Sequence, residues 1–463
     1  MRIIISLLAA IALLLAGLSA FFSGSGRDGN ASFPETEAPP LAASAGAKLY
    51  PPEAMPSDTP GGSLAVSYNL SLALGMPTTE HGVWGGQQSR IARQGEDLYV
   101  LFGIANALPD GEEAFALYRY SGARDEWTYF YTLRSYEIPG LHAAANGNIY
   151  AAYVHARGLG VLEYDPLTDK ITMHDPGVFW PAAHARDHWA YMSTGITAGR
   201  YIWFLGCGNI EGKRGRPGGF AIYKYDTETR SFDMTVEPRH LTEFRHCYNY
   251  VLDDKDGGIV IAGERAIFWD VSEWEQAPGT MDAIWDEVNY WTFKNNSLSD
   301  IRRVDKAMQG ESCPMPNAPI NYAGDAFLDS NGCLHILYTL TSAHIGGRTQ
   351  LWHAVYEDGA EVKKEKLLDG QHSVRLIEDA TGQLYMINLP YNSHTISLFT
   401  VDAQHELTLL REIEIAGNDS IGLAYAGMAV TAPRTGSTPA DFVDVIYPNI
   451  DRTNWIYFRL QLR

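Results

Sequence analysis

The sequence has 463 residues, of which 46% are hydrophobic and 12% aromatic, which supplies a large core and excludes a disordered or collagen-like chain. Lysine and arginine number 35 against 55 acidic residues, and the resulting net charge of −20 argues against a nucleic-acid partner. The 44 glycines, 26 tyrosines and 11 tryptophans favour turns and pleated surfaces over helix, so we predict an all-β protein.

The first segment predicts export. Residues 1–23 combine Arg2, an apolar run and small residues around a candidate cleavage position after Ala20, which is typical of a signal peptide. The alternative is an uncleaved membrane anchor, because the run approaches the length that spans a bilayer. Residues 24–63 are rich in Gly, Ala, Ser, Pro and Thr and predict a flexible linker. We expect a secreted or periplasmic protein, membrane-bound only if the leader stays uncleaved, with its folded body at 64–463.

An internal repeat organises that body. Seven segments each combine an apolar strand, a tight turn containing Gly, Asp or Asn, and a second apolar strand. A third alternating stretch follows each segment, and a fourth, more polar one follows in most. Four strands at this period predict a seven-bladed β-propeller of four-stranded antiparallel blades, whereas sandwiches or small barrels would not require it. The segments begin at Arg90, Ile138, His188, His246, Asn321, His372 and Gly422.

Propeller geometry indicates where chemistry would lie. The start of each innermost strand and the end of the next strand share one face, so their loops build a single funnel. These loops carry many histidines and arginines although the chain is acidic, which predicts an anionic ligand. The seventh unit has an enlarged first turn, and we expect the terminal strand from Trp455 to close the ring against the first unit.

Three residues in the third and fourth units form the sharpest candidate site. His188 opens the third innermost strand, Tyr248 lies in the fourth, and Arg265 ends the strand that follows Tyr248. This arrangement resembles the seven-bladed propeller polysaccharide lyases, such as the ulvan and rhamnose-glucuronate lyases. That family has a second histidine where this chain reads Gly-Cys-Gly-Asn, so Asn209 or His155 would have to replace it.

The resemblance implies β-elimination next to a uronic acid, and the residues suit that chemistry. A cation must neutralise the uronate carboxylate before the C5 proton can leave, which is the role expected of Arg265. A base takes the proton and an acid protonates the leaving oxygen, and His188 and Tyr248 are the candidates. The expected partner is an acidic polysaccharide. The predicted substrate-binding residues are His155, Arg157, Asn209, His246, Tyr322 and His372.

Two other functions remain open. Tyr248 could serve only as packing between blades, and Arg265 beside Glu264 could form an ordinary salt bridge, which would leave a propeller that binds glycans or proteins without cutting them. A propeller glycosidase would instead need two carboxylates facing each other. The candidate carboxylates near the funnel are Glu80, Glu137, Asp187, Glu211, Glu264 and Asp419.

The lyase chemistry requires no cofactor and no catalytic metal. A structural calcium in the channel, or a zinc bound by His246 with nearby cysteines, stays open, although no C-x-x-C or other metal motif is present. In an exported protein the cysteines are free to pair. We expect one bridge among Cys207, Cys247 and Cys313, and we expect Cys333 to be unpaired or buried.

Overall fold

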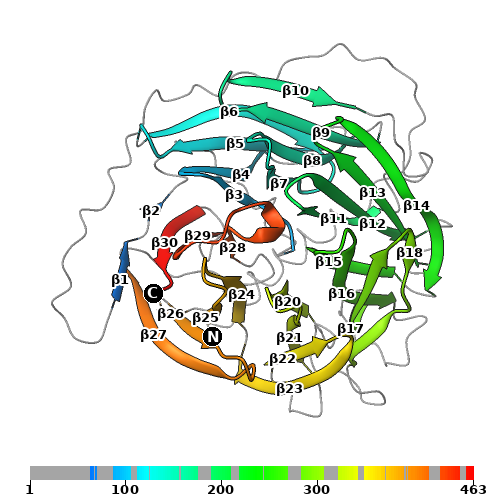
Figure 1. Ribbon diagram of the computed structural model, residues 1–463, viewed down its shortest axis with the longest axis vertical. Helices are drawn as coiled ribbons and strands as arrows, with labels where there is room; N and C mark the ends of the chain where they lie inside the picture. Colours follow the sequence, from blue (N-terminus) through cyan, green and yellow to red (C-terminus); the bar gives the residue numbers. More distant parts are fainter. Residues whose placement is uncertain are drawn as a thin grey trace, which may run out of the picture. The chain divides into compact units, whose positions relative to one another are not determined.

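Seven sheets surround a common axis in the computed structural model, which confirms the all-β, seven-bladed propeller (Figure 1). All described residues belong to the second of the two units of the chain, Ser44–Arg463. The predicted leader (1–23) lies outside them, as does the predicted linker (24–63) except for Ser63. Among the described residues, no helix has the length and hydropathy needed to cross a bilayer. The described residues are 63–66, 68–69, 87–105, 112–124, 126–155, 158–175, 189–209, 218–242, 245–268, 283–306, 322–341, 349–370, 372–390, 393, 395–416, 428–448 and 455–463.

Each blade is named here from its innermost strand outwards. Blade 1 contains β3 (Ile91–Gln94), β4 (Asp97–Ala105), β5 (Glu113–Ser121) and β6 (Glu126–Ser135). Blade 2 contains β7 (Gly140–Ala143), β8 (Ile149–His155), β9 (Gly158–Asp165) and β10 (Lys170–His174). Blade 3 contains β11 (Trp189–Thr197), β12 (Tyr201–Asn209), β13 (Gly218–Asp226) and β14 (Ser231–Thr242). Blade 4 contains β15 (Arg245–Asp253), β16 (Ile259–Phe268), β17 (Ala283–Lys294), and both β18 (Ser297–Leu298) and β19 (Arg302–Lys306), which pair with β17.

The last three blades complete the ring. Blade 5 contains β20 (Tyr322–Leu328), β21 (Leu334–Thr341), β22 (Thr349–Glu357) and β23 (Ala360–Asp369). Blade 6 contains β24 (His372–Glu378), β25 (Leu384–Pro390), β26 (Thr395–Val401), β27 (Leu407–Ala416) and, as a fifth strand, β1 (Ser63–Val66). Blade 7 contains β28 (Ala429–Val430), β29 (Phe442–Pro448), β30 (Trp455–Gln461) and β2 (Tyr68–Asn69), with the 3-10 turn η4 (Pro433–Thr435) between β28 and β29.

The position of a strand within its blade explains its sequence. Neighbouring blades cover both faces of the second strands, so β8 and β25 are buried at every residue except the last. Their sequences are apolar without alternation, as expected for a strand packed on both faces. The outermost strand β23 is exposed or partly exposed throughout, and it contains the charged run Lys363–Lys366. The core therefore lies between the blades.

A repeated aspartate motif forms several of the tight turns. In the turn between β20 and β21, Asp329 Oδ1 accepts hydrogen bonds from the backbone N–H groups of Asn331 (3.0 Å) and Cys333 (2.7 Å), and Gly332 has φ 87°. The turns opened by Asp254, Asp379 and Asp402 repeat the same pair of hydrogen bonds. Aspartate satisfies the backbone locally, and a glycine adopts the positive φ in every one of these turns except that of Asp402, where His405 has φ 61°.

Side chains also join successive blades near the axis. Glu264 Oε1 in blade 4 accepts the backbone N–H of Ala323 in blade 5 at 2.8 Å. Asp325 Oδ2 in blade 5 accepts the N–H of Leu376 in blade 6, also at 2.8 Å. Ser373 in blade 6 accepts the N–H of Met428, just before blade 7, at 2.9 Å. Two of these bonds satisfy the N–H groups of the innermost-strand residues Ala323 and Leu376, and the third satisfies the N–H of the residue just before β28.

The ring closes differently from our prediction. β30, which starts at Trp455, is the third strand of blade 7, where it pairs with β29 and with β2. The N-terminal strand β2 supplies the outermost strand of blade 7, while β1 pairs in parallel with β27 of blade 6. The expectation that the C-terminal strand closes against the first unit was wrong. One edge of β30 pairs with β29 and the other with β2, so neither is open to another blade.

Candidate functional site

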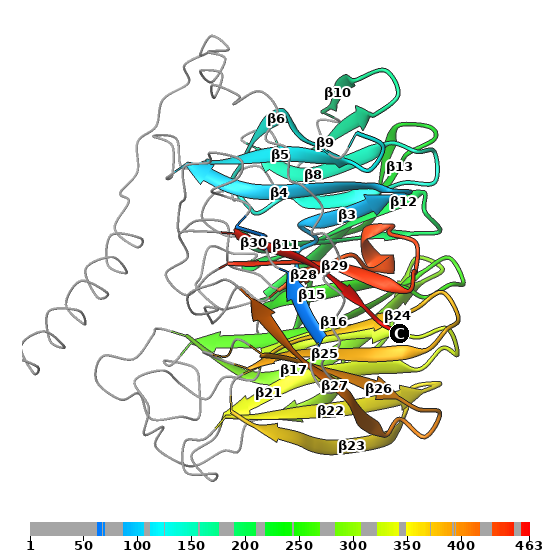
Figure 2. The ribbon, with the colours of Figure 1, turned by 90° about the vertical axis from the view of Figure 1, so that its left-hand side faces the viewer.

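The two faces of the propeller differ in how they are built. On one face, here called the turn face, tight turns join first to second strands, and they lie together on the right of Figure 2. On the opposite face, here called the loop face, innermost strands begin and second strands end, as predicted. The connections of the loop face fall largely outside the described residues, including 210–217, 269–282, 307–321 and 417–427.

Three successive innermost strands are irregular at their loop-face ends. The pairing register shifts by one residue between Trp189 and Tyr191 in β11, and between Ala323 and Asp325 in β20. In β15 it shifts between Cys247 and Tyr250. The described innermost strands of blades 1, 2, 6 and 7 pair without a shift. Bulges re-aim side chains and are common beside functional sites, so blades 3 to 5 form the candidate site.

Tyr248 lies inside the bulge of β15. Its φ of 50° is in the left-handed region, which an aromatic residue adopts only when its surroundings impose it. The ring packs against Trp285 of β17 with centroids 6.3 Å apart, and 8% of the residue is exposed. Trp285 Nε1 donates to the Cys247 sulfur at 3.3 Å. A bulky residue in this region is strained, which makes Tyr248 a candidate for function as well as for packing.

Arg265, on the neighbouring strand β16, is held by two carboxylates. Its Nε donates to Asp286 Oδ1 at 2.9 Å, and its Nη2 contacts the other oxygen of Asp286. The same Nη2 lies 3.0 Å from Glu287 Oε1. Asp286 is the extra residue of a second bulge, in β17. The guanidinium is therefore fixed in orientation, with part of its charge already compensated.

The three predicted histidines on described residues occupy different environments. His246 is buried against Trp291, and burial, followed by the nearby Arg265 charge, lowers its pKa to about 3. It is therefore neutral at ordinary pH. His155, at the end of β8, is half-buried with its Nε2 3.7 Å from Asp175 Oδ1. His372 opens β24, and its Nε2 lies 3.1 Å from the Asp369 carbonyl oxygen.

Other predicted residues are placed only in part. His188 and Arg157 lie outside the described residues, although β11 begins at the residue after His188. Asn209 is the last residue of β12 and pairs with Gly218, and Tyr322 is the first residue of β20 and pairs with Thr339. Their backbones therefore lie on the loop face, in blades 3 and 5.

Sequence reasoning missed Asp286 and Glu287. The available signal was two adjacent acids within the aromatic-rich stretch Ala283–Lys294. An alternating strand would direct these two side chains to opposite faces, whereas the bulge lets both reach Arg265. Only the pairing register between β16 and β17 in the structure shows that bulge.

Of the candidate glycosidase carboxylates, only Glu137 and Glu264 are among the described residues. Glu264 is fully buried, and burial raises its pKa well above the ordinary value, while its Oε1 accepts the Ala323 N–H and joins blades 4 and 5. Burial and then the charge of Glu113 raise the pKa of Glu137 to about 8. The other candidates, Glu80, Asp187, Glu211 and Asp419, lie outside the described residues.

The cysteines correct one expectation. Cys247 and Cys333 are both thiols, so a bridge that includes Cys247 was wrong, because its sulfur packs against the Trp285 indole instead. The buried thiol of Cys333 agrees with our expectation. The Cys207 side chain and Cys313 lie outside the described residues. Across the described part of the chain, no group of three or more His, Cys, Asp or Glu side chains is arranged to hold a metal ion.

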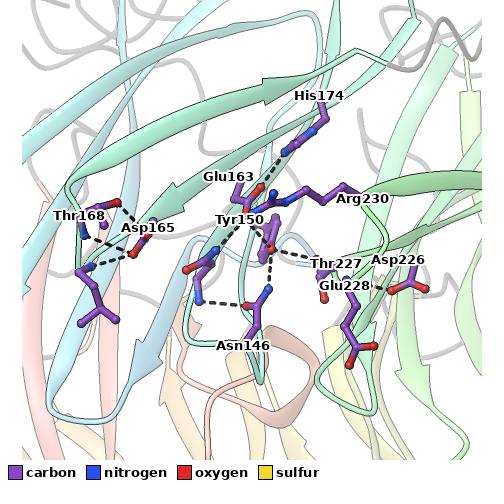
Figure 3. Close-up of polar contacts among 12 residues, drawn as sticks. Asn146, Tyr150, Glu163, Asp165, Thr168, His174, Asp226, Thr227, Glu228 and Arg230 are labelled. Carbon is purple, nitrogen blue, oxygen red and sulfur yellow. Dashed lines mark hydrogen bonds and ion pairs between the residues drawn. The ribbon is translucent and has the colours of Figure 1, made fainter.

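A second polar cluster lies on the turn-face side of blades 2 and 3 (Figure 3). Glu163, 3% exposed, accepts hydrogen bonds from His174 (2.7 Å), Arg230 (2.9 Å), Asn148 (2.7 Å) and Tyr150 (3.2 Å). Asn148, Tyr150 and Arg230 donate to Oε1, and His174 donates to Oε2. This carboxylate therefore joins two blades and has little capacity left for a substrate.

Comparison with known proteins finds only distant structural likenesses. No family model and no curated protein matches the chain. The polysaccharide lyase Uly1 has a TM-score of 0.49 at 11% identity, over 81% of this chain and 90% of its own. An oligogalacturonate lyase solved with manganese has a TM-score of 0.47 at 12% identity, over 81% and 89%. The periplasmic gluconolactonase PpgL of Pseudomonas aeruginosa has 0.41 at 14%, over 72% and 87%. Likenesses this distant establish no activity for this chain.

Proposed function

We propose that the protein is an exported polysaccharide lyase that cleaves an acidic polysaccharide next to a uronic acid. The observation that carries the proposal is the run of bulged innermost strands in blades 3 to 5, with Tyr248 held at φ 50° inside one of them. Arg265 lies on the strand paired with that bulge. Two residues that suit the elimination, Tyr248 and Arg265, thus lie on paired strands where the sheet departs from regular pairing.

The proposed reaction assigns each group a role. Arg265 binds the uronate carboxylate and lowers the cost of charge developing at C5. One of Tyr248 and His188 removes the C5 proton, the C4–C5 double bond forms, and the C4–O bond breaks. The other protonates the departing oxygen. Asp286 keeps the guanidinium oriented, and the scheme uses no metal or other cofactor.

One observation favours a second function. Asp286 and Glu287 already hold Arg265, so part of the positive charge needed for elimination is compensated within the protein. A propeller that binds acidic glycans without cutting them would need less positive charge at Arg265 than a lyase. The same loop face would serve that function, with His155, Arg157, Asn209, Tyr322 and His372 as contacts in either case. His246, also predicted as a contact, is 3% exposed and packs against Trp291, so it is too buried to contact a glycan.

Ultraviolet absorbance of the protein incubated with a panel of uronate-containing polysaccharides tests the proposal. Elimination creates a conjugated double bond, so we expect absorbance to rise, and Tyr248→Phe to lower kcat by ~10²–10⁴-fold. Tyr99→Phe, which changes a buried tyrosine of blade 1, is the matched control and should keep the activity. Binding with no rise in absorbance would establish the glycan-binding alternative, and new reducing ends without absorbance would indicate a hydrolase.

A further inference from the structure

The enlarged first turn of blade 7 fills the axis from the turn face. Its 3-10 turn η4, orange-red near the centre of Figure 1, packs against β3, β7, β11 and β15. Gly436 follows it with φ 76°, and a Cβ there would overlap the carbonyl oxygen of Ala143. We call Pro433–Gly436 the axial plug. Its fit against β7 leaves no room for a side chain at Gly436.

One side chain of the axial plug reaches two of the three bulged strands. Arg434 Nη1 donates to Asp325 Oδ1 in β20 at 2.8 Å, and both side chains are at least 95% buried. Its guanidinium carbon also lies 5.1 Å from the ring centroid of Tyr250 in β15. Tyr250 and Asp325 are the residues at which pairing resumes after the bulges of β15 and β20. Arg434 therefore contacts the closing residue of each bulge.

Further bonds tie these bulges to one another. The Tyr250 hydroxyl donates to the carbonyl oxygen of Gly324 at 2.8 Å, and Arg375 Nη1 donates to the same oxygen at 2.7 Å. Gly324 is the extra residue of the β20 bulge. The third bulged strand, β11, packs directly on η4, and Thr194 of that strand lies 3.0 Å from His142 Nε2 of β7. The plug thus contacts all three strands that form the candidate site.

We infer that Arg434 is a positioning residue, which sets the conformation of the loop-face ends of β15 and β20 and hence the placement of Tyr248 and Tyr322. The expected effect of Arg434 on lyase activity rests on the proposed function. Its expected effect on the backbone conformation of β15 and β20 does not. Loss of the guanidinium would leave Asp325 buried without its cation. It would also free the Tyr250 ring, so both bulges would open more readily.

Hydrogen exchange read by mass spectrometry on the full chain tests the inference. Arg434→Gln alone leaves a buried charge, so the informative variant is Arg434→Gln combined with Asp325→Asn, which removes both charges and restores the melting temperature towards wild type. We expect amides of residues 247–250 and 323–325 to exchange at least about tenfold faster in this double variant. Arg434→Lys, which keeps the charge, should show a smaller increase.

The matched control is the buried pair Arg93–Asp444 at the junction of blades 1 and 7, with side chains 6% and 0% exposed. Arg93→Gln with Asp444→Asn should leave exchange at 247–250 and 323–325 unchanged. The inference would be overturned if the Arg434/Asp325 double variant exchanged the amides of both bulges at the wild-type rate. It would also be overturned if the control variant showed an equal increase in the exchange rate of these amides. If wild type is a lyase, kcat should fall in the Arg434/Asp325 double variant more than in the control. Absence of lyase activity in wild type would refute the proposed function alone.

Discussion

Glu163 shows how single residues join the blades of this acidic chain. A carboxylate buried without partners is costly, and here donors from blades 2 and 3 surround it (Figure 3). Burial alone would raise the pKa of Glu163, but hydrogen bonds from His174, Arg230 and Asn148 bring it below its ordinary value of 4.5. A lowered folded-state pKa means that the ionised form stabilises the fold.

Glu163→Gln should therefore lower the free energy of unfolding by about 1–3 kcal/mol at neutral pH, because the amide cannot accept from all four donors. The contribution of Glu163 is present above a pH of about 4.5 and is lost as pH falls through the lower folded-state pKa. Urea unfolding across this range should show a weaker loss of stability in acid for the variant. Exposed Glu412→Gln is the control, and an equal effect there would contradict the assignment.

Part of the candidate site could be predicted from single residues of the sequence. Tyr248 and Arg265 could be chosen because residue type and place in the repeat are local properties of the sequence. Their partners Asp286 and Trp285 could not, because contact between them depends on the register of β17 against β16. Whether Tyr248, Arg265 and His188 act together stays a prediction.

At the scale of elements, turns were predictable and bulges were not. A turn encodes its conformation in its own residues, as Asp402 does by accepting the N–H groups of Gln404 (2.9 Å) and Glu406 (2.8 Å). A bulge shifts the register by one residue, and in a strand buried on both faces this shift leaves no break in the hydrophobic pattern. The irregular ends of β11, β15 and β20 are therefore invisible in the sequence.

Asp402→Ala should lower the free energy of unfolding by ~1–2 kcal/mol, because the β26–β27 turn loses two side-chain hydrogen bonds. Asp402→Asn keeps an acceptor oxygen and should lose less than half of that amount. Guanidinium chloride unfolding of both variants measures the difference. Equal losses would show that the negative charge, rather than the two hydrogen bonds, stabilises this turn.

At the scale of the whole molecule, the N-terminal strands complete the ring. β2 pairs with β30 and β1 with β27, so residues before blade 1 finish blades 6 and 7. A propeller whose outer strand comes from the opposite end of the chain resists opening between its first and last blades. The seventh blade would otherwise have three described strands.

Removal of residues 1–70 should therefore lower the melting temperature by several degrees and expose β30 as an edge that promotes association. Removal of residues 1–60 retains β1 and β2 and serves as the control. Thermal unfolding combined with light scattering measures both effects. Identical melting and scattering for the two truncations would show that β1 and β2 do not contribute to closure.

The sequence by itself determined the strands, the turn chemistry and the number of blades, because each follows from neighbours along the chain: apolar runs, Asp and Gly at turns, and their repetition. Only the tertiary structure decided how the ring closes, which strands bulge, and that Arg434 meets Asp325 across more than a hundred residues. Those features depend on pairings between distant segments, and such pairings leave no periodic signal in the sequence. For the same reason, the sequence repeat was enough to predict which face carries the loops. The geometry of the candidate site on that face could be described only from the folded structure.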